Sequence, residues 1–178
     1  MDDIKSWRFV PVAFLMVVLT ALQGCATTPA PPAEPEAVSD GEEMYQNGDR
    51  WYLRGCYQEA LRYYFAAYEY FCAGDRLAPA ARALNSIGNL YRRLGDPNAA
   101  VTFYGEALEI DRRLGDGTGE AQTLINRSAA LLDAGQAEKA AADLRRADPL
   151  AKGTPRLELA LARSRGILAT RGGDLAAA

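Results

Sequence analysis

From residue 41 onward the sequence repeats itself at a shift of 40 residues, and this period limits the possible folds more than any other feature of the chain. A small residue, a large residue and a glycine recur in the same order: Gly48, Gly88 and Ser128, then Trp51, Tyr91 and Leu131, then Gly55, Gly95 and Gly135. A fixed period of this length is typical of a solenoid, in which similar units stack and bury a shared core. The sequence therefore predicts three stacked units, at 41–80, 81–120 and 121–158.

Each unit contains two sets of recurring positions, and both have helical spacing. Positions 4, 8 and 11 of the unit are spaced i, i+4, i+7, as are positions 20, 24 and 27, so each set lies on one face of a helix. Position 15 is glycine in all three units, as expected where a chain leaves a helix with positive φ. Asp96 and Pro97 fit the N-cap and the first turn of a second helix. The chain is therefore predicted to be all-α, with each unit a helix, a tight turn and a helix.

Small residues at two positions favour close packing of the two helices in a unit. Gly or Ser at position 8 and Ala at position 20 remove side-chain bulk where the helices touch. Large residues at positions 11 and 24 fill the space beside that contact: Trp51 with Tyr64, Tyr91 with Tyr104, and Leu131 with Leu144. One such pair cannot bury its apolar face alone, so neighbouring units must cover it.

This pattern resembles the tetratricopeptide repeat, which has a bulky residue at position 4, Leu-Gly at 7 and 8, Tyr at 11, Ala at 20, an aromatic residue at 24 and Ala at 27. The middle unit matches it closely, with Leu84, Ile87, Gly88, Tyr91, Ala100, Tyr104 and Ala107. The long period is similar to the longer-helix subgroup found in motor light chains and polarity adaptors. The resemblance implies a helix-turn-helix solenoid, wound as a right-handed superhelix, that binds other proteins.

In the resembled family, the first helices of successive units line a concave groove. The positions implied here are Tyr45, Gln46, Asp49 and Tyr52 in the first unit, Arg82, Asn85, Ser86, Asn89, Arg92 and Arg93 in the second, and Gln122, Asn126 and Asp133 in the third. Asparagine amides can bond both the N–H and the C=O groups of an extended peptide. The three arginines offer forked donors for carboxylates. We therefore expect an extended, somewhat acidic segment of another protein as the ligand, the alternative being that the arginines form only a solvated face.

The N-terminal region has the features of a targeting segment. Lys5 and Arg8 precede an apolar run at 9–22, which is typical of a secretory signal and short for a membrane span. The Leu-Gln-Gly-Cys sequence that ends at Cys25 resembles the lipobox of bacterial lipoproteins. This resemblance implies a signal peptide at 1–24 and a lipid anchor on the Cys25 thiol. The alternative is an uncleaved anchor helix with an incidental cysteine.

Residues 25–40 are predicted to form a tether, since four prolines among them favour an extended chain. Ala26 follows the cysteine, where well-studied Gram-negative lipoproteins retained at the inner membrane carry aspartate. By this resemblance we expect a lipid-anchored protein of the cell envelope, at the periplasmic face of the outer membrane.

The composition excludes several kinds of site. The chain has 0 His and 3 Cys, which removes imidazole metal sites and His-based triads and leaves no paired cysteine ligands. Its 20 basic and 23 acidic residues argue against a broad nucleic-acid-binding surface. The glycine-rich residues 115–119 lack the strand and the Lys-Ser/Thr of a phosphate loop, so they predict a turn between units. We expect no enzyme, metal or cofactor, and we expect acidic residues such as Asp111 to be solvated.

Aromatic residues are crowded in the first unit, which holds ten of the 16 in the chain: Tyr45, Trp51, Tyr52, Tyr57, Tyr63, Tyr64, Phe65, Tyr68, Tyr70 and Phe71. A helix cannot hide so many rings on one face. We favour an interaction surface here, because aromatic residues are enriched at interface cores. The alternative is that the N-terminal linker folds back over them.

The C-terminal residues 159–178 are open to two interpretations, a capping helix or a truncated fourth unit. Taken together, the features of the whole sequence predict a membrane-anchored scaffold or adaptor that recruits other proteins. The alternatives are an assembly factor, such as a pilotin-like or outer-membrane biogenesis lipoprotein, a fragment of a longer enzyme, and a carrier of a small ligand within the superhelix.

Overall fold

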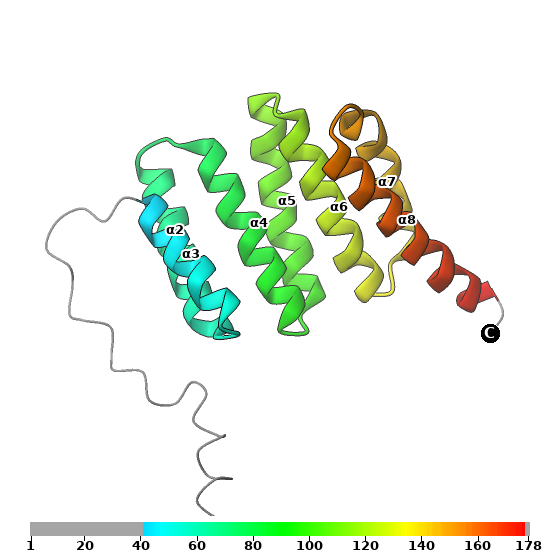
Figure 1. Ribbon diagram of the computed structural model, residues 1–178, viewed down its shortest axis with the longest axis horizontal. Helices are drawn as coiled ribbons and strands as arrows, with labels where there is room; N and C mark the ends of the chain where they lie inside the picture. The colour runs from blue at the N-terminus through cyan, green and yellow to red at the C-terminus, as the bar shows by residue number, and fades with distance from the viewer. Residues whose placement is uncertain (1–40, 177–178) are drawn as a thin grey trace, which may run out of the picture. The chain divides into compact units, whose positions relative to one another are not determined.

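The computed structural model describes the backbone of residues 41–176 and the side chains of residues 41–171. This part of the chain is all-α, as predicted, and its helices are α2 (Gly41–Leu53), α3 (Tyr57–Ala73), α4 (Leu77–Arg93), α5 (Pro97–Leu114), α6 (Gly117–Asp133), α7 (Ala137–Ala151) and α8 (Pro155–Ala176) (Figure 1). Among the described residues, no helix combines the length and the apolar character needed to cross a membrane. The predicted signal peptide, the Cys25 lipid site and the tether lie outside the described residues.

The first helix of each unit ends where the sequence predicted it would end. Gly55, Gly95 and Gly135 adopt φ angles of 77°, 85° and 74°, a left-handed conformation that residues with a Cβ rarely adopt. The peptide N–H after each of these glycines turns back to a carbonyl of the helix, as in the 2.9 Å bond from Asp96 N to Tyr91 O. Each unit is therefore closed by the same tight turn.

Aspartate side chains cap the N-termini of two helices, α5 and α6. The Asp96 carboxylate accepts the N–H of Ala99 at 2.9 Å, with Pro97 at the first position of α5. The Asp116 carboxylate likewise accepts the N–H of Gly119 at 2.9 Å at the start of α6. Both bonds satisfy a donor that a helix N-terminus leaves unpaired. The glycine-rich residues 115–119 are thus a turn and a helix start, as predicted.

The helices pack as pairs, α2 with α3, α4 with α5 and α6 with α7, and each pair stacks on the next in chain order (Figure 1). Two glycines allow the close approach within a pair. A Cβ added to Gly48 would lie 2.6 Å from the Tyr64 ring, and one added to Gly88 would lie 2.7 Å from the Tyr104 ring. Ala60, on the second helix of the first unit, is fully buried. The predicted roles of small and large residues are therefore seen directly.

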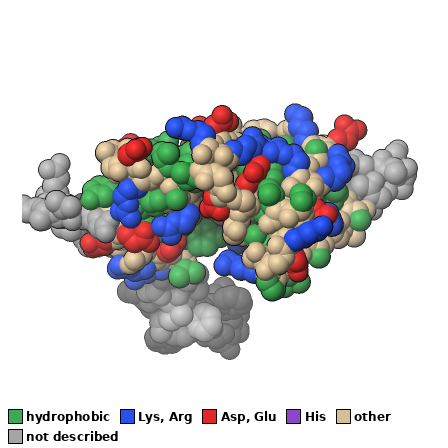
Figure 2. Space-filling model, turned by 90° about the horizontal axis from the view of Figure 1, so that it is seen from above, with side chains coloured by type: hydrophobic (Ala, Val, Ile, Leu, Met, Phe, Trp, Pro, Cys, Tyr) green, Lys and Arg blue, Asp and Glu red, His purple; other side chains and the backbone are tan. Residues whose placement is uncertain are grey.

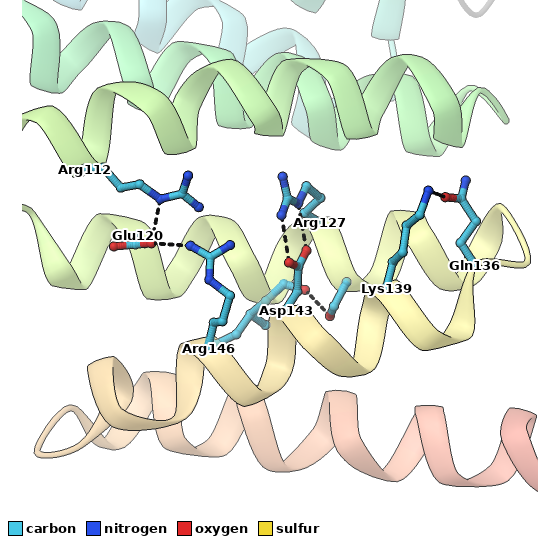
Figure 3. Close-up of polar contacts among 9 residues, drawn as sticks. Arg112, Glu120, Arg127, Gln136, Lys139, Asp143 and Arg146 are labelled. Carbon is cyan, nitrogen blue, oxygen red and sulfur yellow. Dashed lines mark hydrogen bonds and ion pairs between the residues drawn. The ribbon is translucent and has the colours of Figure 1, made fainter.

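The third unit closes its helix pair with a different set of residues. Ser128 occupies the glycine position, and its hydroxyl donates to the Ile125 carbonyl at 2.7 Å within the same helix. The facing position, which is a tyrosine in the first two units, is here Leu144, and it is buried. Beside them, the Arg127 guanidinium makes two 2.7 Å bonds to the Asp143 carboxylate, joining α6 to α7 (Figure 3).

Helix α8 lies where the first helix of a next unit would lie, packed against α7 and α6. It begins at Pro155. Leu157 and Leu161 are buried in the core of the third unit, whereas Leu159 is 73% exposed. The helix therefore covers the third unit with one side and presents its other side to solvent.

Charged side chains of both signs are interspersed over the face drawn in Figure 2, and neither sign forms a broad patch there. This agrees with a chain of nearly balanced charge.

Candidate functional site

The first helices of the units, α2, α4 and α6, together with α8, carry the residues predicted to line a groove. Polar side chains on these helices contact one another from unit to unit at sequence separations of 38 to 41 residues. These separations match the repeat period, so the contacts run across the stack instead of along one helix. We call the surface that these helices share the A-helix face.

At the N-terminal end of the A-helix face, α2 and α4 are joined by two polar contacts. The Tyr45 hydroxyl and the Ser86 hydroxyl lie 2.7 Å apart, and the Arg82 guanidinium donates to the Glu42 carboxylate at 3.0 Å. Arg82 also lies 5.3 Å from the centre of the Tyr45 ring, a cation–π contact. Burial raises the pKa of Tyr45, so its hydroxyl stays protonated and available as a donor.

In the middle of the A-helix face, side-chain amides of α4 and α6 meet. Asn85 donates to the Thr123 hydroxyl at 2.6 Å, and Asn126 donates to the Asn85 carbonyl at 3.4 Å. Gln122 in turn donates to the Asn126 carbonyl at 3.1 Å. Asn85, Gln122 and Asn126 are half-buried, so they remain in contact with solvent while holding one another in place. We call these three residues the amide cluster.

At the C-terminal end, Asp133 receives arginines from two other helices. Arg92 of α4 donates to it at 2.8 Å and Arg171 of α8 at 2.9 Å. Partial burial acts to raise the pKa of Asp133, but bonds to the two guanidiniums outweigh it and lower that pKa. A small surface pocket lies here, lined by Arg92, Ala129, Leu132, Asp133, Ser164, Ile167 and Arg171.

Two of the predicted groove residues are turned toward the second helix of their own unit. The Asp49 carboxylate accepts the Tyr64 hydroxyl at 2.6 Å, and the Asn89 carbonyl accepts the Tyr104 hydroxyl at 2.8 Å. Burial, followed by the bond to Asp49, raises the pKa of Tyr64. Asp49 and Asn89 therefore have a structural bond that the sequence interpretation did not foresee.

Asp111 is buried, which corrects the expectation that it is solvated. Its side chain is 4% exposed, and its carboxylate accepts the Thr123 hydroxyl at 2.9 Å. Burial raises its pKa to about 6 despite that bond, with the carboxylates of Asp116 and Glu120 adding to the effect. The expectation failed because position 31 of the unit faces the next first helix, α6, and not solvent.

The aromatic residues of the first unit are largely accommodated within the stack. Tyr64 and Phe71 are buried, and the other eight side chains are half-buried. Phe65 reaches the next unit, where its ring lies 5.7 Å from Phe103, and Phe103 stacks on Tyr91 at 5.0 Å. The crowding is explained in good part by packing between units, so it needs no partner protein to cover fully exposed rings.

Two overlapping segments of the chain, 51–113 and 79–152, match the family model described as tetratricopeptide repeat. Together they span more than half of the 178 residues. The chain belongs to the tetratricopeptide repeat family. This is a family of protein-binding repeats and not of enzymes. No curated protein is significantly similar to the chain.

Several solved structures share this fold. The type III secretion translocator chaperone SycD of Yersinia enterocolitica is 21% identical, with a TM-score of 0.62 over 78% of this chain and 88% of SycD. PcrH of Pseudomonas aeruginosa is 20% identical, with a TM-score of 0.61 over 77% of this chain and 96% of PcrH. The first repeat domain of Spaghetti (RPAP3), bound to an HSP90 peptide, is 19% identical, with a TM-score of 0.56 over 72% of this chain and 93% of that domain. At these identities the likeness shows the fold alone.

The fold brings most of the predicted groove residues of this tetratricopeptide repeat protein onto one surface, but in separate groups. Arg93 lies away from the amide cluster, 5.7 Å from the centre of the Tyr52 ring. Arg82 and Arg92, expected to offer free donors to a ligand, are each already paired with a carboxylate of the protein. A guanidinium has five N–H donors, so one internal bond occupies only part of its capacity.

Glu42, Thr123 and Arg171 belong to these groups and were not predicted from the sequence. The signal that could have found them was the repeat itself, since each lies 38 to 40 residues from its partner on a neighbouring first helix. Among residues 41–171, no group of acidic, cysteine or histidine side chains is placed to hold a metal ion.

Proposed function

We propose that this protein is an interaction scaffold of the cell envelope, anchored by a lipid on Cys25 at the periplasmic face of the outer membrane. Its A-helix face binds an extended, somewhat acidic segment of a partner protein. The observation that carries the binding part of this proposal is the amide cluster at the centre of that face. Its half-buried amides are held by one another and by Thr123, so they can bond a peptide backbone with little further loss of side-chain freedom.

The ion pairs at the two ends of the A-helix face are compatible with an acidic ligand. The side chains of Arg82 and Glu42 are 55% and 35% exposed, and those of Arg92 and Asp133 are 37% and 34% exposed. Ion pairs this accessible contribute about 0 to 1 kcal/mol. A carboxylate of the partner can therefore replace the internal carboxylate at a small cost in free energy, so both arginines can bind an acidic ligand.

The binding part of the proposal can be tested by site-specific photo-crosslinking in native membranes. A photoreactive residue at Gln122, in the amide cluster, should crosslink to one or a few proteins, identified by mass spectrometry. The same residue at Asn98, exposed on α5, is the matched control and should give none of these products. Equal labelling from both positions would contradict the assignment of the A-helix face.

The same comparison can be made with substitutions. Asn126→Leu should reduce capture of the crosslinked partner, because it removes an amide from the cluster, and Arg93→Glu should reduce it by repelling an acidic segment. Asn98→Leu should leave capture unchanged. If Asn126→Leu binds as well as the unaltered protein, the amide cluster is not the binding site.

The anchoring part requires a separate experiment, because Cys25 lies outside the described residues. Labelled palmitate should be incorporated into the protein, and Cys25→Ser should abolish both the label and sedimentation with outer-membrane fractions. Palmitate labelling that survives the substitution would overturn this part of the proposal only.

A second candidate function is assembly or chaperoning of an exported protein. It is favoured by the fold likeness to SycD, seen in complex with a peptide of the translocator YopD, and to PcrH, seen with the chaperone-binding region of PopD. Under this alternative the crosslinked partner would be an exported or membrane-assembling subunit, captured before its assembly.

A further inference from the structure

A series of hydrogen bonds runs in one direction from the amide cluster to a buried carboxylate, and the NH2 group of Asn85 also donates to the Ala81 carbonyl of its own helix at 3.4 Å. Gln122 donates to Asn126 at 3.1 Å, Asn126 to Asn85 at 3.4 Å, and Asn85 to the Thr123 hydroxyl at 2.6 Å. The Thr123 hydroxyl then donates to the Asp111 carboxylate at 2.9 Å. The chain therefore runs from the surface of the A-helix face into the packed contact between α5 and α6.

The chemistry of the last member sets this direction. An ionised carboxylate can only accept hydrogen bonds, so the Thr123 hydroxyl must give its proton to Asp111. Its oxygen is then free only to accept, and Asn85 must turn its NH2 group inward to donate to it. This leaves the carbonyl oxygen of Asn85 directed toward Asn126 on the A-helix face.

The site around Asp111 is shaped to hold a carboxylate. Gly119, in the first turn of α6, leaves the space it needs, since a Cβ there would lie 2.8 Å from Oδ1 of Asp111. The equivalent position is fully buried Phe71 in the first unit and Ala151, 1% exposed, in the third. An apolar residue thus fills this position in the first and third units, so packing alone does not require an acid here.

We infer that Asp111 is a positioning residue for the A-helix face, fixing through Thr123 which end of the Asn85 amide is presented to a bound peptide. The inference rests on the proposed function for its biological meaning. In the ionised state of Asp111, the centre of the face presents a carbonyl acceptor at Asn85, which suits a peptide N–H. Protonation of Asp111 lets the carboxyl donate to Thr123, whose hydroxyl can then donate to the carbonyl of Asn85. The Asn85 amide turns over and gives up its bond to the Ala81 carbonyl, and its NH2 group faces the site. The Asn126 amide must turn with it, because its NH2 group now donates to Asn85 and would otherwise meet a second donor.

The charged groups around Asp111 favour protonation in a mildly acidic range. Asp116 and Glu120, at the start of α6, both raise its pKa, although burial is the larger cause, and the resulting pKa is about 6. Glu120 is itself paired with Arg112 of α5 at 2.9 Å and Arg146 of α7 at 3.0 Å (Figure 3). Where α5 packs against α4, the residues in contact are apolar, such as Leu84 and Ala107. They carry no positive charge that could lower the pKa of Asp111.

The inference can be tested by NMR on the full 178-residue chain with no ligand present. The side-chain amide signals of Asn85 and Asn126, assigned by their loss in Asn85→Ser and Asn126→Ser, are followed with the carboxyl carbon of Asp111 from about pH 8 to pH 4.5. We expect all three to shift together with one midpoint near 6. Amide signals that stay constant while Asp111 titrates would overturn the inference, as would a carboxyl that remains ionised to the lowest pH.

Two substitutions separate this role from a merely structural one. Asp111→Asn should remove the common midpoint from both amide signals, because no ionisable group remains at the end of the chain. Glu109→Gln, the matched control, removes an exposed acid two residues away on the same helix and should leave the titration unchanged. A midpoint that persists in Asp111→Asn would contradict the inference.

These measurements need no binding partner. Failure of the crosslinking experiment would therefore remove the binding part of the proposed function and leave the titration result standing. Conversely, constant amide signals would remove the role of Asp111 without affecting partner capture.

Discussion

In the second unit the ring of Tyr104 packs over Gly88 and donates its hydroxyl to Asn89, whereas in the third unit Leu144 takes the place of the tyrosine. The glycine and asparagine positions are then Ser128 and Ala129. In the second unit, Ile87 and Phe103 belong to one apolar cluster. The corresponding residues of the third unit are Arg127 and Asp143, which form an ion pair.

The comparison shows that the repeat fixes the backbone of a helix pair more strictly than the side chains that close it. A tyrosine ring requires glycine beneath it and an acceptor for its hydroxyl. A leucine requires neither, so the positions beneath it can carry a serine and an alanine. Residues that touch change together, and each unit remains complementary within itself.

The largest expected effect comes from breaking the ion pair that is specific to the third unit. Arg127→Met leaves the Asp143 carboxylate, 5% exposed, without its guanidinium, and should lower the free energy of unfolding by about 3 to 4 kcal/mol. Urea-induced unfolding followed by circular dichroism measures this. Combining Arg127→Met with Asp143→Leu should recover most of the loss, since both positions are then apolar, as in the second unit.

The matched control for that experiment is Arg146→Met. Its partner Glu120 keeps a second arginine, Arg112, and the Arg146 side chain is 47% exposed, so the change should cost no more than about 1 kcal/mol. If Arg127→Met costs as little as Arg146→Met, the third unit does not depend on its buried pair.

The second prediction concerns position 31, where the second unit alone has a buried acid. Because burial raises the pKa of Asp111 from 3.8 to about 6, the folded state binds a proton more tightly than the unfolded state between these values. Stability should therefore fall by about 2 to 3 kcal/mol from this group as the pH rises from about 4 to 7. Denaturant unfolding of the unaltered protein and of Asp111→Asn, across that range, measures the difference.

In Asp111→Asn this part of the pH dependence should disappear, leaving the contributions of other groups. The lowered pKa of Asp133 acts in the opposite direction, since its stabilisation is lost as the pH falls through that pKa. If the free energy of unfolding of Asp111→Asn varied with pH in the same way as that of the unaltered protein, the pKa of Asp111 would not be raised by folding.

The smallest effect sharpens the role of the glycine under the tyrosine. Gly88→Ala places a Cβ 2.7 Å from the fully buried Tyr104 ring and should destabilise the protein by about 1 to 2 kcal/mol, even though alanine favours helix. Gly105→Ala is the control, because a Cβ there meets no atom within 4 Å and should stabilise α5 by up to about 1 kcal/mol. Thermal unfolding of the two variants should move in opposite directions, and a shared direction would contradict the packing described for the second unit.

Much of the fold could be predicted because it depends on local signals, most of which recur in all three units. Glycine at position 15, Asp96 before Pro97 and the two helical stripes fixed the helix type and the turns. The predicted site residues were brought together only in part. Asn85 and Asn126 do meet on one surface, but Asn89 and Asp49 bond tyrosines of their own units. Family positions indicate which helix carries a residue, and they leave its rotamer and its partner open.

The sequence by itself determined that this protein is a row of helix pairs, because a period and a glycine turn act on residues close together in the chain. Only the tertiary structure decided that Asp111 is buried and joined through Thr123 to Asn85. These contacts link residues 12 and 38 positions apart, and whether an acid there meets water or a hydroxyl depends on how closely α5 packs against α6. The pKa and the hydrogen bonds of a buried acid depend on the side chains packed around it, and these come from segments far apart in the sequence.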